Sequence, residues 1–241
     1  MGGRVYTKRA CVCGAQGDAN PQTGDHAFLC IKSTTRQLAA TDAAAALAVV
    51  IQGLPGVKLY GRSRVHRSMR TRPDEPTFRH AATNIGAVLA GPADADRRFD
   101  IGFTANGVQH YVDCMKTATI SGDNINKACQ KQGHAVEAGD RTKISSYRKS
   151  ISNFDAMRHH IWFATIDTNG TMSTDFTKLV QYIAKVAYPG VGADGRYDVD
   201  GLRSRCVARL RVAAGCGVWR ANHRTITAWA AAGSTINDMA A

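Results

Sequence analysis

The stretch RRFDIGFTANGVQHYVDCMK, residues 97–116, decides the fold, because two alternating runs of apolar and polar residues are joined in it by Asn106 and Gly107. Asn-Gly between such runs predicts a β-hairpin with a type I′ turn, in which both central residues need a positive φ. Counted outward from this turn, Ala105 pairs with Val108, and Asp100 pairs with Asp113. The stretch therefore predicts strands over 97–103 and 108–114.

The hairpin sorts its side chains onto two faces, because alternate residues of a strand point in opposite directions. One face should carry Phe99, Ile101, Phe103, Val112 and Cys114. The other face should carry Asp100 and Asp113 directly opposite each other, where like charges are destabilising. A divalent cation would offset this repulsion, since Mg²⁺ is typically held by one or two carboxylates together with phosphate oxygens and water. The alternative is that both aspartates are solvated on an exposed face.

The rest of the chain alternates helical and extended patterns. Residues 33–52 open with Ser and Thr caps and run through strong helix formers to Gly53, which predicts a helix. Residues 56–61 and 161–167 are expected to be strands. Further helices are expected over 124–151, with a break at Gly133 or Gly139, over 174–187, and over 199–231, with a break near 215–217. This order predicts an α/β fold with a small mixed sheet flanked by helices.

Composition points to a basic protein with a core of ordinary size. The 241 residues include 31 Lys and Arg against 19 Asp and Glu, a net charge of +12, which favours phosphate-bearing partners such as nucleic acid. A basic segment without apolar period is expected to be an exposed loop along phosphates, the alternative being a solvated loop. Its basic residues are Lys58, Arg62, Arg64, Arg67, Arg70 and Arg72.

No stretch approaches the roughly 20 uninterrupted apolar residues of a membrane span. The first residues, MGGRVYTKRA, lack the apolar core of a secretory signal. We therefore expect an intracellular protein without membrane partners, and the sequence does not distinguish the nucleus from an organelle.

A Cys/His cluster marks the N-terminal region, residues 1–32, which is otherwise rich in Gly, Asp, Asn and Pro. The spacing of Cys11, Cys13, His26 and Cys30 supplies three sulfurs and one nitrogen, a recognised set for structural zinc. Free thiols beside a surface histidine are the alternative. The chain is thus expected to divide into a zinc-knuckle module at 1–32, a core at 33–190 and a C-terminal helical extension at 191–241.

Taken in order, these motifs resemble a known family. RRFDIGF, YVDC, the helix containing DRTKISSY and the following apolar strand resemble the restriction-endonuclease-like fold of PD-(D/E)xK nucleases. The chain is more specifically similar to the endonuclease domain that follows the reverse transcriptase in some non-LTR retrotransposons, in which a CCHC zinc knuckle precedes the nuclease. The resemblance covers roughly residues 11–167 and, more weakly, the C-terminal helices.

The resemblance implies roles for individual residues. Asp100 matches the aspartate of the PD motif, with Phe99 in place of proline, and Asp113 matches the second acid. The motif would place a lysine at position 115, where this chain has Met115. In the retrotransposon branch the lysine comes from the following helix, which makes Lys143 the candidate, with Lys116 as the fallback. Tyr147, one turn after Lys143, joins the nucleic-acid-binding candidates Arg62, Arg64, Arg67, Arg70 and Arg72.

The implied reaction is metal-dependent hydrolysis of nucleic-acid phosphodiester bonds, with DNA favoured over RNA as substrate. Asp100 and Asp113 would hold Mg²⁺ or Mn²⁺, and Lys143 would orient the attacking water or stabilise developing negative charge. The missing lysine at position 115 favours a second interpretation, a catalytically inactive nucleic-acid-binding or ribonucleoprotein component derived from the same fold. A zinc-dependent scaffold for protein partners is a third.

Overall fold

The computed structural model describes residues 35–62, 75–117, 127, 130–190 and 198–238. The predicted zinc ligands Cys11, Cys13, His26 and Cys30 lie outside the described residues, as do Arg64, Arg67, Arg70 and Arg72.

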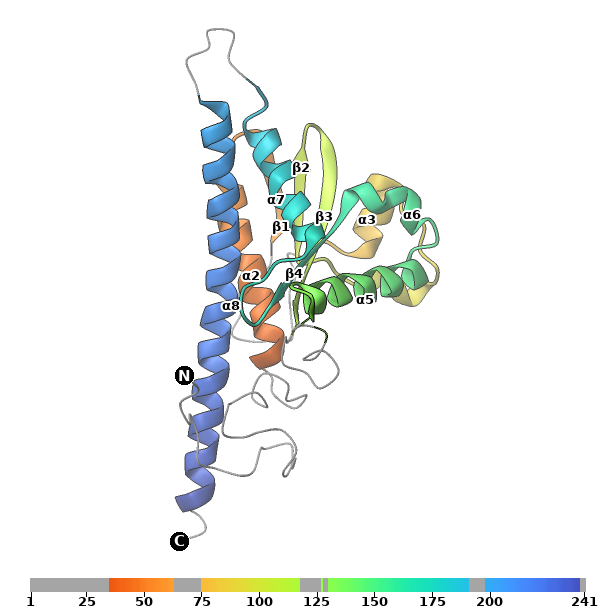
Figure 1. The fold of residues 1–241 in the computed structure, drawn as a ribbon. Helices are drawn as coiled ribbons and strands as arrows, with labels where there is room; N and C mark the ends of the chain where they lie inside the picture. The colour runs from red at the N-terminus through yellow and green to blue at the C-terminus, as the bar shows by residue number, and fades with distance from the viewer. Residues whose placement is uncertain (1–34, 63–74, 118–126, 128–129, 191–197, 239–241) are drawn as a thin grey trace.

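A four-stranded mixed sheet forms the centre of the fold (Figure 1). Its order is β1 (Val57–Arg62), β2 (Ile101–Ala105), β3 (Val108–Thr117) and β4 (Ile161–Asp167). The first three strands are antiparallel neighbours, and β4 runs parallel to β3. The predicted α/β class with a small mixed sheet is therefore confirmed.

The hairpin forms with the predicted turn and register. Asn106 has φ of 52° and Gly107 has φ of 75°, and the five ladder pairs run from Ala105 with Val108 to Ile101 with Val112. The strand is shorter at its start than predicted, because β2 begins at Ile101 and Asp100 lies just before it.

The segment before β2 pairs elsewhere. Thr77 forms a β-bridge with Arg98, and the backbone N–H of Phe99 donates to the carbonyl of Pro76 at 2.9 Å. The prediction that Phe99 shares a face with Ile101 was wrong, because this pairing turns the Phe99 ring into the opposite core, where it lies 4.8 Å from Tyr111 between ring centroids.

Helices cover both faces of the sheet (Figure 1). On one face lie α2 (Thr35–Gln52), α7 (Thr174–Ala187) and α8 (Val199–Asp238), whose apolar side chains share a core with Ile101, Phe103 and Val112. On the other face lie α3 (Phe78–Ile85), α5 (His134–Ser150) and α6 (Phe154–Met157), around an aromatic core. Short 3₁₀ helices span Pro92–Asp96 (η1) and Arg158–His160 (η2).

Helix α5 begins directly after Gly133, whose φ of 79° ends the preceding turn, but it runs through Gly139 without a break. Gly139 instead allows the helix to approach the sheet closely. A Cβ atom there would lie 2.7 Å from Cγ2 of Thr117 and 2.8 Å from Cγ2 of Thr165. This contact fixes the height of α5 above β3 and β4.

Helix α8 is continuous over its 40 residues, so the predicted break near 215–217 was wrong. At Gly217 it crosses α2, and a Cβ there would lie 2.7 Å from the carbonyl oxygen of Asp42 and 2.8 Å from Cα of Ala43. The glycine allows a close helix crossing and leaves the helix intact.

Among the helices of the described residues, α8 included, none combines the length and the apolar composition needed to cross a lipid bilayer.

Candidate active site

Asp113 is the centre of a polar network between the sheet and α5. It lies on β3, is 8% exposed, and points to the face that α5 covers. Its Oδ2 accepts hydrogen bonds from Nζ of Lys143 at 2.7 Å and from the hydroxyl of Tyr147 at 2.6 Å. The ammonium and the phenol thus hold one carboxylate oxygen from two successive turns of the same helix.

The spacing of the two donors follows from helix geometry, because residues four apart share a helix face. Tyr147 is buried, and its ring packs among Phe78, Phe99 and Phe163. We expected Tyr147 to bind nucleic acid, but its burial leaves no surface for such a contact. Its hydroxyl positions Asp113 instead.

Arg97 packs its guanidinium over the ring of Tyr147. Its guanidinium lies 5.4 Å from the Tyr147 ring centroid and 5.0 Å from that of Phe78, at cation–π distance. The same group donates hydrogen bonds to the hydroxyls of Ser146, at 3.1 Å, and Ser150. Arg97 therefore ties the segment before β2 to the α5 face that carries the donors of Asp113.

Asp100 lies next to this network. Its Oδ2 accepts the backbone N–H of Cys114 at 2.7 Å, which joins the start of β2 to β3 beyond the last ladder pair. Burial raises the pKa of the Asp100 carboxyl well above its usual range, and the neighbouring charge of Asp113 raises it further. The Cys114 hydrogen bond and the positive charge of Lys143 offset part of this shift.

Glu75 is a third acid that the sequence reading missed. It is 5% exposed, and its negative charge raises the pKa of both Asp100 and the Cys114 thiol. In the sequence it stands beside a proline in a polar stretch and resembles a loop residue. Only the bridge between Thr77 and Arg98 brings it to the hairpin, and nothing in the local pattern predicts that pairing.

The protonation states of the site follow from this charge balance. Burial and the charge of Asp113 raise the pKa of Tyr147 well above its usual range, so the phenol remains a hydrogen-bond donor. Burial and the charge of Asp100 likewise raise the pKa of Cys114, so its thiol remains neutral. Lys143 is the cation that contacts Asp113 directly.

Residues 115 and 116 lie on opposite faces of β3. Met115 is on the α5 side of β3, with its sulfur 3.7 Å from the place a Cβ would take on Gly139. Lys116 follows it on the strand and so points to the opposite face. The structure thus brings Lys143, and not Lys116, to Asp113.

Of the six basic residues expected to lie along phosphates, only Lys58 and Arg62 belong to the described residues. Lys58 is exposed as expected and falls in the strand predicted over 56–61, which forms as β1, where it pairs with Thr104. The expected loop was wrong for Arg62, because it ends β1 and pairs with Ile101 of β2. The side chain of Arg62 and the remaining arginines are outside the described residues.

Asp100 and Asp113 carry the kind of oxygen ligand that Mg²⁺ takes. In the part of the chain that the structure describes, no three or more His, Cys, Asp or Glu residues are grouped so as to bind a metal. Mg²⁺ commonly takes only one or two carboxylates and completes its shell with water and phosphate oxygens. Burial is the main cause of the raised pKa of Asp100, and the charges of Asp113 and Glu75 raise it further, an excess of negative charge that a cation would relieve.

No protein-family model, curated protein or solved structure matches the chain.

Proposed function

We propose that the chain is a metal-dependent endonuclease domain of the non-LTR retrotransposon type, with a restriction-endonuclease-like core, and that it hydrolyses phosphodiester bonds of nucleic acid. One observation carries the proposal: Lys143 contacts Asp113 at 2.7 Å, and Asp113 lies beside the half-buried Asp100. Two carboxylates and a lysine are the groups that phosphodiester hydrolysis of this kind requires. The mixed sheet and its flanking helices agree with such a core.

The roles of the side chains follow from their contacts. Asp100 and Asp113 would hold Mg²⁺ or Mn²⁺, which supplies positive charge to a phosphoryl oxygen and acidifies bound water. Lys143 would donate to the attacking water or to the oxygen that gains negative charge in the transition state. Tyr147 donates to the same oxygen of Asp113 as Lys143, so it orients the carboxylate and keeps its place when the lysine turns toward substrate.

The N-terminal CCHC set completes the proposal. Cys11, Cys13, His26 and Cys30 would bind a structural zinc ion, which would order a segment whose polar composition offers little core of its own. This knuckle would contact nucleic acid beside the nuclease core.

A nicking assay tests the activity. Supercoiled plasmid DNA and a labelled RNA are incubated with the full chain in Mg²⁺, in Mn²⁺ and in EDTA. We expect metal-dependent cleavage that Asp113→Asn and Asp100→Asn abolish, while Asp155→Asn, an exposed acid paired with Arg148, leaves it unchanged. Cleavage that persists in both site variants would rule out the site.

A second function is favoured by the hydrogen bonds that Asp113 already accepts within the protein. Both donors of α5 bind Oδ2 of Asp113, and the lysine expected at 115 is a methionine. A protein that lost catalysis would keep such a network as structure and act as a nucleic-acid-binding or ribonucleoprotein component. Metal-independent binding without cleavage of either substrate would favour this function over the endonuclease.

A further inference from the structure

The described part of α8 is basic in an unusual way. Between residues 201 and 225 it holds no Asp, no Glu and no Lys. Its charged residues are Arg203, Arg205, Arg209, Arg211, Arg220 and Arg224. A helix face that serves solubility usually mixes both signs and forms pairs one turn apart. Arg203 has such a partner in Asp200 of the first turn, at 3.5 Å, and the composition leaves the later arginines without one on this stretch of the helix.

Two of the six arginines stabilise the fold through contacts with other elements. Arg203 donates to the carbonyls of Tyr188, at 2.8 Å, and Pro189, at 3.0 Å, which anchors the start of α8. Arg224 forms an ion pair with the buried carboxylate of Asp42 on α2. These two side chains are committed to the fold.

Other arginines have no acidic partner. Arg205 and Arg220 donate to the carbonyls of Gly201 and Cys216 one turn earlier, at 3.3 Å in each case. Within the described ranges, no ion pair involves Arg205, Arg209, Arg211 or Arg220, and all four are exposed. Their positive charge is therefore available to a partner.

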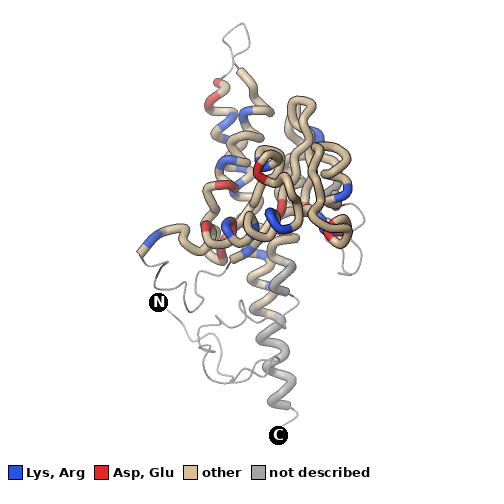
Figure 2. The backbone as a smooth tube through the Cα atoms, turned by 90° about the vertical axis from the view of Figure 1, so that its right-hand side faces the viewer, with Lys and Arg blue, Asp and Glu red and all other residues tan. Residues whose placement is uncertain are grey.

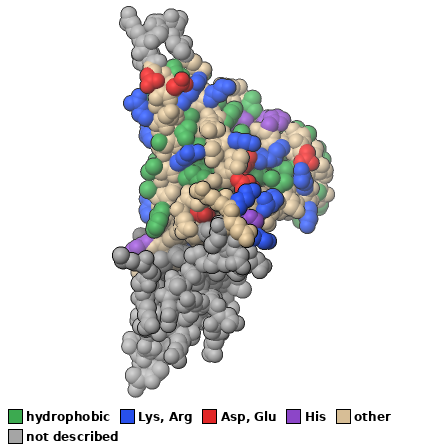
Figure 3. Space-filling model, in the orientation of Figure 1, with side chains coloured by type: hydrophobic (Ala, Val, Ile, Leu, Met, Phe, Trp, Pro, Cys, Tyr) green, Lys and Arg blue, Asp and Glu red, His purple; other side chains and the backbone are tan. Residues whose placement is uncertain are grey.

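Three of these arginines share one face of the helix. At 100° per residue, Arg209 and Arg220 lie within about 60° of Arg205, and the three span about 22 Å of helix axis. We call this the α8 face. Figure 2 shows Lys and Arg recurring along the upper part of α8, and in Figure 3 the left edge, which α8 forms, carries basic and hydrophobic side chains.

Trp219 borders the α8 face and is 62% exposed, and Val212, two turns earlier on the same side of the helix, is 64% exposed. Its indole nitrogen lies near Gly170, in the turn after β4, at 4.0 Å from the place a Cβ would take there. An exposed aromatic ring next to unpaired arginines is the combination by which proteins bind single strands, since bases stack on the ring and phosphates pair with the cations.

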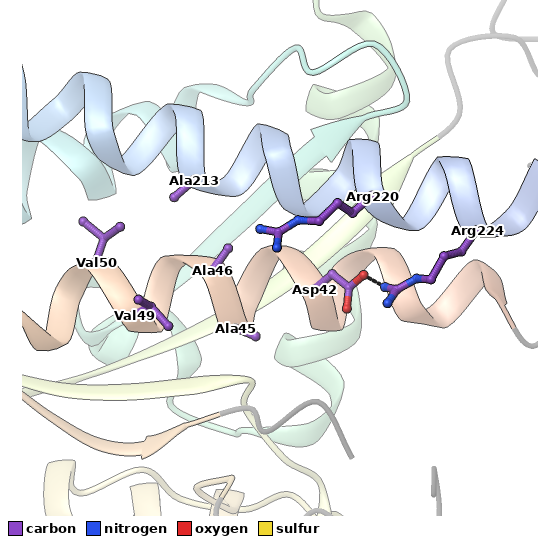
Figure 4. Close-up of a pocket in the computed structure, with 8 residues that line it drawn as sticks. All are labelled: Asp42, Ala45, Ala46, Val49, Val50, Ala213, Arg220 and Arg224. Carbon is purple, nitrogen blue, oxygen red and sulfur yellow. Dashed lines mark ion pairs between the residues drawn. The ribbon is translucent and has the colours of Figure 1, made fainter. Parts of the chain in front are cut away.

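Arg220 also lines a groove of about 510 Å³ between α2 and α8 (Figure 4). The floor of the groove is apolar, from Ala45, Ala46, Val49, Val50 and Ala213. Its lining includes one acid, Asp42, which already pairs with Arg224. The groove therefore gives Arg220 no carboxylate of its own, and the guanidinium remains available to an anion from outside.

We infer that the α8 face binds single-stranded nucleic acid, with Arg205, Arg209 and Arg220 on phosphates and Trp219 stacked on an unpaired base. Arginine suits phosphate better than lysine does, because its planar fork donates two parallel hydrogen bonds. The face lies on the α2 and α7 side of the sheet, opposite to Asp113. It is thus a second contact surface, and it rests on the proposed function in that both sites take nucleic acid.

Anisotropy measurements test the phosphate contacts. The full chain is titrated, in EDTA and at several salt concentrations, against a labelled single-stranded oligonucleotide and its duplex. We expect Arg205→Gln/Arg209→Gln to weaken single-strand binding and to reduce the slope of log affinity against log salt by about 1.4, since each phosphate contact contributes roughly 0.7. The matched control, Lys178→Gln/Lys185→Gln on exposed positions of α7, removes the same charge and should leave the slope nearly unchanged.

Trp219→Ala tests the stacking. Loss of one stacked base should weaken single-strand binding about fivefold or more and leave duplex binding nearly unchanged. Val212→Ala, an exposed apolar residue bordering the same face, is the control and should have no effect. Thermal melting confirms that each variant is folded.

The outcomes separate this inference from the proposed function. Equal salt slopes in the two double variants, or an unchanged affinity in Trp219→Ala, would overturn the inference that the α8 face binds single-stranded nucleic acid. We would expect this result if the α8 face binds an acidic protein segment instead. Such a result leaves metal-dependent cleavage, measured with the Asp113 variant, untouched. Binding through α8 by a chain that cleaves nothing would support the face and overturn the endonuclease.

Discussion

Nζ of Lys143 on α5 lies 2.7 Å from Oδ2 of Asp113 on β3, and the two residues are 30 positions apart in the chain. The contact is partly screened from solvent, with the lysine side chain 28% exposed and the aspartate side chain 11%. The residual exposure of the lysine leaves it a path toward a bound phosphate. A lysine from the helix that follows the hairpin thus reaches Asp113, as the proposed function requires.

Replacement of Lys143 separates catalysis from binding. We expect Lys143→Ala to lower the cleavage rate about 10²- to 10³-fold, the usual loss for one donor to a developing oxyanion. Nucleic-acid affinity in EDTA should change little, because one charge of a net +12 is removed. Lys149→Ala, an exposed lysine on the same helix, is the control. Single-turnover cleavage and anisotropy measure the two quantities, and equal rates for both variants would exclude a catalytic role for Lys143.

Removal of the Tyr147 hydroxyl tests its support of Asp113. Tyr147→Phe keeps the buried ring and deletes a 2.6 Å hydrogen bond to a buried carboxylate, which should cost about 1.5–3 kcal/mol in the free energy of unfolding. Tyr60→Phe is the matched control, because the hydroxyl of Tyr60 bonds neutral groups, the carbonyl of His110 at 3.4 Å and the side chain of Tyr111, where Tyr147 bonds a carboxylate. Urea denaturation compares the two. A loss no greater in Tyr147→Phe than in Tyr60→Phe would contradict the positioning role.

Asp140 makes stability depend on pH. It is 5% exposed on α5, and burial, with smaller contributions from the charges of Asp175 and Glu137, raises its pKa to about 6. Because the folded pKa exceeds the unfolded value of about 3.9, the folded state binds the proton more tightly. The free energy of unfolding should therefore fall as pH rises from about 4 to about 6, by at most about 3 kcal/mol from this group.

Asp140→Asn removes that titration. The variant should be more stable than the parent above pH 6 and should lose the decline between pH 4 and 6 that Asp140 causes. Asp155→Asn, which changes an exposed acid, should keep the decline. Chemical denaturation at intervals across this range gives the profile, and parallel profiles for the parent and Asp140→Asn would show that Asp140 does not cause the decline.

Local signals in the sequence predicted much of this fold. Asn106-Gly107 gave the turn and the register as far as Ile101, because both depend on residues within a few positions of each other. Helix α7 was predicted at its observed limits, and its start is capped by Ser173, whose side chain accepts the N–H of Phe176. Lys143, the candidate that the family resemblance indicated, contacts Asp113, and its catalytic role stays a prediction.

The missed features depend on contacts between distant segments. Glu75 and Arg97 are brought to the site by the β-bridge between Thr77 and Arg98, which the pattern of apolar residues in the sequence does not predict. Gly139 and Gly217 resembled helix breaks, but each lies where its helix closely approaches another element. A glycine that ends a helix and a glycine that permits a crossing look the same until the partner element is known.

Zinc content tests the N-terminal proposal. The purified full chain should contain about one zinc per molecule, and Cys11→Ser should lose most of it, since four ligands complete a structural site. Cys216→Ser replaces an exposed thiol on α8 and should retain the metal. Elemental analysis after dialysis gives the ratio. Equal zinc in the parent and Cys11→Ser would contradict the assignment of Cys11 as a ligand.

Gly217 and Gly215 give opposite predictions for the same substitution. Gly217→Ala would place a Cβ 2.7 Å from the carbonyl oxygen of Asp42, so α8 must move away from α2, at a cost of about 1–3 kcal/mol for overpacking. Gly215→Ala meets nothing within 4 Å and should stabilise the helix by up to about 1 kcal/mol, the difference in helix propensity between the two residues. Thermal melting should therefore shift the midpoint downward for Gly217→Ala and upward for Gly215→Ala. Two upward shifts would mean that α8 is free to separate from α2 at this crossing, and the groove beside Arg220 would then lack a fixed wall.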